Sequence, residues 1–156
     1  MNAVVITLSL LVALVLALLP MPLPVDAFRP DWLLLVLVYW TMALPHRVSV
    51  GIAWLSGLLM DIMLGSTLGV HALAMTIAVY IAAVNFQRLR NFSVWQQALI
   101  IAVLVAVKLV LVYWVEHLAN GVMLTARYFW PVLTSAVMWL WLFPLLRRVR
   151  RKFRVR

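Results

Sequence analysis

The feature that most constrains this chain is a series of long apolar segments separated by short polar breaks. The segments cover residues 3–19, 32–44, 48–64, 68–86, 95–118 and 128–146. A helix needs about 20 mostly apolar residues to cross a hydrocarbon core of about 30 Å. Hydrophobic residues make up 67% of the chain and charged residues only 11%, which is not the composition of a water-soluble domain. The sequence therefore predicts an all-α integral membrane protein.

The two N-terminal segments leave the number of membrane passes open. Residues 3–19 lack the basic start and the small-residue cleavage site of a signal peptide, so we expect a retained helix. Residues 32–44 are too few to span alone, although counting from Phe28 makes a span feasible. We expect a bundle of six transmembrane helices, with five plus a re-entrant segment as the alternative. Residues 1–146 form one helical domain and residues 147–156 a basic tail.

Basic residues indicate the orientation in the membrane. Seven of the 13 lie in the last ten positions: Arg147, Arg148, Arg150, Arg151, Lys152, Arg154 and Arg156. Because cytoplasmic ends are enriched in Lys and Arg, we place this tail on the cytoplasmic side of the membrane. Six passes then make the N-terminus cytoplasmic, together with Arg47, Arg88 and Arg90, and only Arg29 and Arg127 fall outside.

The basic tail has two interpretations. As a membrane anchor it is attracted to anionic lipids, at up to about 1 kcal/mol per basic side chain. As a docking segment it binds an acidic cytoplasmic surface. The anchor is favoured because basic clusters beside a span are common. Nucleic acid is not an expected partner, since no folded basic domain accompanies the tail.

Asp61 is the most informative single residue because an ionisable group inside a span is costly. It lies in a stripe of small residues at a spacing of four, formed by Ala53, Gly57, Asp61 and Gly65, which is typical of closely packed transmembrane helices. We therefore expect Asp61 to face protein, either as a packing or partner-binding residue or as a proton or ligand site. Packing is favoured, and it predicts that Asn is tolerated at position 61 while Leu is not.

Lys108 is the other charged residue well inside an apolar segment. Lys108 and Asp61 lie at about the same depth, roughly 20 Å from the cytoplasmic end of each helix, so a buried ion pair is one alternative. The small residues of its own segment, Ala98, Ala102 and Ala106, lie on the opposite face. That arrangement favours a Lys108 that faces another subunit or extends toward the interface. The role of Lys108 stays open.

Enzymatic chemistry has little support in the sequence. Intramembrane aspartyl proteolysis needs two Asp carboxylates at one site, and Asp61 is the only Asp within the predicted segments. The chain contains no Cys, His spacings typical of zinc sites are absent, and no phosphate-binding loop or dinucleotide fingerprint occurs. We expect no catalytic residues, no cofactor and no metal.

Four motifs connect the chain to a known family. They are F-R-P-D-W at 28–32, A-L-P-H-R-V-S-V-G at 43–51, G-L-L-M-D-I-M-L-G-S-T-L-G-V at 57–70 and W-Q-Q-A at 95–98. Together they resemble the rod shape-determining MreD family of Gram-negative bacteria, over essentially the whole chain. The second and third motifs are specific, whereas the fourth alone would be weak.

The resemblance implies a role and partners that composition does not give. It implies a non-catalytic inner-membrane member of the cell-elongation machinery that binds the bitopic protein MreC. MreB filaments, the glycosyltransferase RodA and a class B penicillin-binding transpeptidase act in the same complex, which directs side-wall peptidoglycan synthesis. The implied fold is similar to the substrate-binding components of energy-coupling-factor transporters.

Two functions from different classes follow. The primary hypothesis is a scaffold that presents a groove to the single transmembrane helix of a partner. The alternative is a vitamin-like small-molecule binding or uptake component, which needs a polar pocket opening outward. Ionisable residues do gather toward that side: Asp26, Asp31, Asp61, His71, Glu116 and His117.

Overall fold

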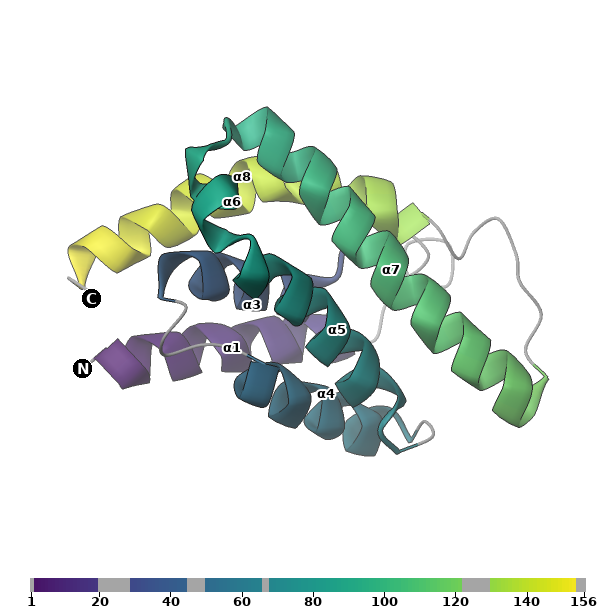
Figure 1. Cartoon of the computed structure of the whole chain (residues 1–156). Helices are drawn as coiled ribbons and strands as arrows, with labels where there is room; N and C mark the ends of the chain where they lie inside the picture. Colours follow the sequence, from purple (N-terminus) through teal and green to yellow (C-terminus); the bar gives the residue numbers. More distant parts are fainter. Residues whose placement is uncertain (1, 20–28, 45–49, 66–67, 122–129, 154–156) are drawn as a thin grey trace.

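A computed structural model describes residues 2–19, 29–44, 50–65, 68–121 and 130–153. Within these ranges the secondary structure is entirely α-helical, as predicted, and consists of seven helices (Figure 1). They are α1 (Asn2–Leu18), α3 (Trp32–Ala43), α4 (Val50–Leu64), α5 (Val70–Val84), α6 (Phe86–Asn91), α7 (Val94–Asn120) and α8 (Trp130–Lys152).

Six of these helices coincide with the apolar segments, and α6 is an addition. It lies in the polar break before the fifth apolar segment, and its Leu89 is buried against the core. Helices α7 and α8 are long and apolar enough to cross a membrane, while α1, α3, α4 and α5 are shorter apolar helices. This pattern is consistent with a helical membrane protein.

The longer helices alternate in direction along the chain. Figure 1 shows α1 running away from the end marked N, α3 returning, and α4, α5, α7 and α8 continuing this alternation. The start of α1 and the end of α8 consequently lie at the same end of the molecule. We refer to this as the terminal end, and to the other as the far end.

Helix α3 forms the centre of the bundle. Nearly every residue from Leu33 to Ala43 is buried, because α3 contacts α1, α5, α6 and α8. A helix that is apolar on all sides is expected to be enclosed in this way. Two polar contacts fix it: the indole Nε1 of Trp40 donates to Ser9 Oγ of α1 at 2.8 Å, and Arg90 of α6 donates to the carbonyls of Met42 and Ala43 at 2.6 and 2.7 Å.

Helix α7 has well-defined ends. Ser93 and Gln96 form a capping box at its start, the reciprocal arrangement that satisfies two unpaired N–H groups. Gly121 ends it with a φ of 67°, a left-handed conformation that glycine adopts without steric cost. These caps set α7 at its full length, from the terminal end to the far end.

Candidate functional site

The stripe of small residues on α4 packs against α5. Ala53 and Gly57 are buried, and a Cβ atom built on Gly57 would lie 2.4 Å from the Cα atom of Ala72. Only glycine fits such a backbone contact, which is the close approach that the stripe predicts. Gly65 behaves differently: it is exposed, has a φ of 68° and follows the end of α4.

The Asp61 carboxylate caps the start of α5. Its side chain accepts hydrogen bonds from the backbone N–H groups of Gly69 at 2.9 Å, His71 at 3.1 Å and Ala72 at 3.3 Å. The ring Nδ1 of His71 lies 2.8 Å from Asp61 Oδ1. These N–H groups have no partner within their own helix, and the N-cap residue Gly69 has no side chain to satisfy them. Asp61, only 1% exposed, does so from the preceding helix.

Lys108 forms an ion pair with Asp31. Its Nζ contacts Asp31 Oδ2, and both side chains are nearly inaccessible to solvent. Asp31 is also the N-cap of α3, since its side chain accepts from the N–H of Leu34 at 3.4 Å. Its own N–H donates to Ser135 Oγ of α8 at 3.0 Å. Lys108 is therefore in an internal ion pair, as one of the alternatives predicted, but its partner is Asp31 and not the expected Asp61.

The position of Asp31 follows from the shortness of α3. With 12 residues, α3 extends only about 18 Å, and its first turn lies inside the bundle beside Lys108. Lys108 lies near the middle of the longer α7, at the level where α3 begins. From the sequence, Asp31 was expected only as one of the ionisable residues toward the outer side. The signal that could have identified it is an Asp directly before an apolar helix, the preferred N-cap position.

These contacts make one buried polar cluster, which consists of Asp31, Asp61, His71, Lys108 and Ser135. His71 links its two halves, because it contacts Asp61 and lies within electrostatic range of both Lys108 and Asp31. Each carboxylate has its own cationic or N–H partners, unlike the shared carboxylates of aspartyl proteases. In the described part of the chain no group of three His, Asp or Glu side chains is arranged to hold a metal ion.

The basic tail begins as a continuation of α8. Arg147, Arg148, Arg150, Arg151 and Lys152 all lie within the helix, at the terminal end (Figure 1). Arg154 and Arg156 lie outside the described residues. Helix α8 thus continues past residue 146 into the tail.

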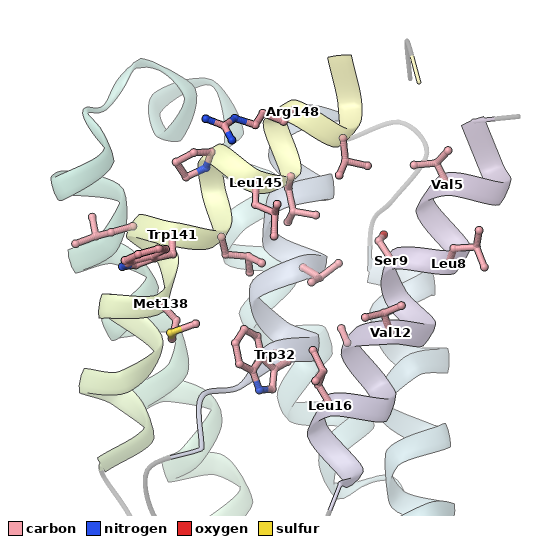
Figure 2. Close-up of a pocket in the computed structure, with 17 residues that line it drawn as sticks. Val5, Leu8, Ser9, Val12, Leu16, Trp32, Met138, Trp141, Leu145 and Arg148 are labelled. Carbon is pink, nitrogen blue, oxygen red and sulfur yellow. The ribbon is translucent and has the colours of Figure 1, made fainter. Parts of the chain in front are cut away.

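A large apolar groove lies between α1 and α8. It has a volume of about 810 Å³, and Trp32 and Val36 of α3 contribute to its lining. Figure 2 shows Val12 and Leu16 of α1 on one side and Met138 and Leu145 of α8 on the other, with Trp32 between them. The polar residues in its lining are Ser9 and Arg148. None of the residues expected at a partner interface, which are Ala53, Gly57, Asp61 and Gly65, lines this groove.

Comparison with known proteins gives the family. The model of the rod shape-determining protein MreD matches residues 1–149. The rod shape-determining protein MreD of Haemophilus influenzae is 40% identical over 148 residues, which cover 92% of this chain and 89% of that protein. No solved structure matches the chain significantly. The chain therefore belongs to the MreD family of rod shape-determining proteins.

Proposed function

We propose that this protein is a non-catalytic scaffold of the bacterial cell-elongation complex. Family membership gives the general role, the determination of rod shape. The scaffold binds the transmembrane helix of MreC and acts with MreB, RodA and a class B penicillin-binding transpeptidase in side-wall peptidoglycan synthesis. These partners follow from the resemblance of the sequence motifs to the family.

The proposed setting is the inner membrane, crossed six times, with both termini in the cytoplasm. The alternating helix directions support an even number of passes, and the two termini lie at one end (Figure 1). The basic residues of α8 lie at that same end, as expected for a cytoplasmic face. An architecture similar to the substrate-binding components of energy-coupling-factor transporters belongs to the same proposal.

The observation that carries the proposal is the groove between α1 and α8. Its lining on α1 extends from Val5 to Leu16, a length of about 17 Å at 1.5 Å per residue. Both walls are helices, and the lining is almost wholly apolar. A single apolar helix is a suitable occupant, because transmembrane helices associate mainly by close packing of complementary surfaces.

The uptake alternative has less support from the geometry. It needs a polar pocket at the far end, and three of the side chains expected to form one are already engaged. Asp61 caps α5 and contacts the ring of His71, and Asp31 pairs with Lys108. The larger of the two cavities described for this chain is the apolar groove, which does not suit a polar vitamin-like ligand.

Co-purification from native membranes tests the proposal. A tagged Val12→Trp variant fills the groove and is expected to recover at least about fivefold less MreC, which corresponds to roughly 1 kcal/mol of binding free energy. Val103→Trp is the matched control, because Val12 and Val103 are 58% and 61% exposed and Val103 lies on α7 outside the groove. Equal recovery of MreC with both variants would contradict binding in the groove. Recovery of transporter ATPase subunits instead would favour the uptake alternative.

A further inference from the structure

A second, smaller pocket lies at the terminal end, on the other side of α8 from the groove. It has a volume of about 330 Å³ and lies where α3 ends, α7 begins and α8 emerges from the bundle. Its lining is cationic and polar at one side and apolar at the other, and comprises Tyr39, Met42, Ala43, Arg90, Gln97, Phe143, Arg147 and Arg150.

In the described part of the chain, no acidic side chain lies beside the three arginines of this pocket. The described acids are Asp31, Asp61 and Glu116, and each lies toward the far-end half of its helix or at the far-end start of α3. No carboxylate lines the pocket, and no ion pair of Arg147 or Arg150 occurs among the described residues. Three like charges at one pocket are mutually repulsive, so an external anion would be stabilising there.

Hydrogen bonds hold part of the pocket wall in place. Arg90 is anchored by its hydrogen bonds to Met42 and Ala43 at the end of α3. Gln97 donates to the carbonyl of Leu89 at 2.7 Å and accepts from the indole of Trp139 at 3.3 Å. Tyr39 is only 2% exposed and lies within electrostatic range of Arg150 and Arg147. Polar groups that are held in this way, here Arg90 and Gln97, lose little conformational entropy on binding.

The depth of the pocket indicates which anion reaches it. From Trp130 to Leu146, α8 extends about 25 Å, close to the thickness of the hydrocarbon core. Arg147 and Arg150 therefore lie at the level of lipid phosphates on the cytoplasmic side. The planar fork of an arginine matches the oxygens of a phosphate group in a bidentate manner.

We propose that Arg90, Arg147 and Arg150, with Tyr39, bind the phosphate group of an anionic lipid headgroup in this pocket. The inference depends on the orientation in the proposed function and is independent of the groove. It differs from general attraction of a basic tail to the membrane, because only the basic residues that line the pocket take part. Arg151 and Lys152 are exposed, belong to the same helix and do not line it.

The experiment measures retention of phosphatidylglycerol by the purified full chain in detergent, by native mass spectrometry, with phosphatidylcholine as the neutral reference. Arg147→Gln/Arg150→Gln is expected to weaken phosphatidylglycerol binding about tenfold, the loss of one strong charged contact. Arg151→Gln/Lys152→Gln removes the same charge and is expected to change it less than about twofold. Unchanged thermal unfolding of both variants shows that the fold is intact.

Three results would overturn the proposal. Equal losses in both double variants would show unspecific attraction to the tail. No preference for phosphatidylglycerol over phosphatidylcholine would show that no headgroup charge is recognised. If inorganic phosphate alone raised the midpoint of thermal unfolding as much as the lipid does, the pocket would be a site for free phosphate. Val12→Trp is expected to retain normal lipid binding, so failure of the groove proposal is distinguishable from failure of this one.

Discussion

The far end and the terminal end of this bundle differ in how their charged side chains are neutralised. Toward the far end, the cluster of Asp31, Asp61, His71, Lys108 and Ser135 is buried, and its opposite charges and N–H groups neutralise one another. At the terminal end, the arginines of α6 and α8 gather with no acid among the described residues around them. Burial without a partner is costly for an ion, and the buried charges of the far end accordingly have partners within the chain. The arginines of the terminal end rely on solvent, lipid or another external group for neutralisation.

The largest expected effect comes from removing the Asp61 carboxylate, which caps α5 toward the far end. Asp61→Leu leaves the N–H groups of Gly69, His71 and Ala72 without their acceptor. We expect a loss of about 3 kcal/mol or more in the free energy of unfolding. Unfolding in mixed detergent measures it, with Glu116→Leu, a half-buried acid on α7, as the control. A loss no larger than that of the control would contradict the capping role.

Asp61→Asn refines the same comparison. An amide keeps one oxygen as acceptor, but its NH₂ group faces N–H donors where the carboxylate had a second oxygen. We therefore expect a cost of about 1–3 kcal/mol, intermediate between wild type and Asp61→Leu. The packing interpretation of the sequence predicted that Asn is tolerated at position 61, whereas the structure predicts this loss of stability. A free energy of unfolding equal to that of the wild type would support the prediction from the sequence.

Breaking the ion pair tests the other half of the buried polar cluster. Lys108→Leu leaves Asp31 charged and buried without its partner, at an expected cost of about 3 kcal/mol. The double variant Lys108→Leu/Asp31→Asn is expected to recover much of this loss, because Asn is neutral and still caps α3. Recovery would appear as a higher midpoint of thermal unfolding for the double variant. Additive losses would show that the two residues do not interact.

The contact between α4 and α5 provides a smaller effect with a matched control in one helix. Gly57→Ala places a Cβ atom 2.4 Å from Ala72 Cα, so the helices must separate, at a cost of about 1–3 kcal/mol. Gly51→Ala meets no atom within 4 Å, and it is expected to be neutral or stabilising by up to about 1 kcal/mol. The difference between their unfolding midpoints checks the prediction, and equal midpoints would contradict the close packing.

The smallest effect is expected at the terminal end. Arg147→Gln/Arg150→Gln removes two cations that have no ion pair in the described chain. We expect a change within about 0.5 kcal/mol in lipid-free detergent, in contrast to the losses from Asp61→Leu and Lys108→Leu. A large loss in the free energy of unfolding would show that these arginines also have stabilising partners within the chain. The contrast between the two ends would then be wrong.

The sequence alone predicted a substantial part of this molecule. The apolar segments gave the helices to within a few residues, because hydropathy and turn residues are local properties. The stripe on α4 predicted that Asp61 faces protein, since residues four apart share a helix face. The motifs from Phe28 to Ala98 gave the family, which the comparisons confirmed.

Tertiary structure decided the partners of the charged residues. Lys108 pairs with Asp31, 77 positions away, because α3 is short and starts inside the bundle at the level of Lys108. Asp61 caps α5 because the turn at Gly69 returns the chain onto α4. Hydrophobic periodicity determines which residues avoid water, but it carries no information about the depth at which a helix begins. That depth depends on packing among all the helices, and it determines which opposite charges meet.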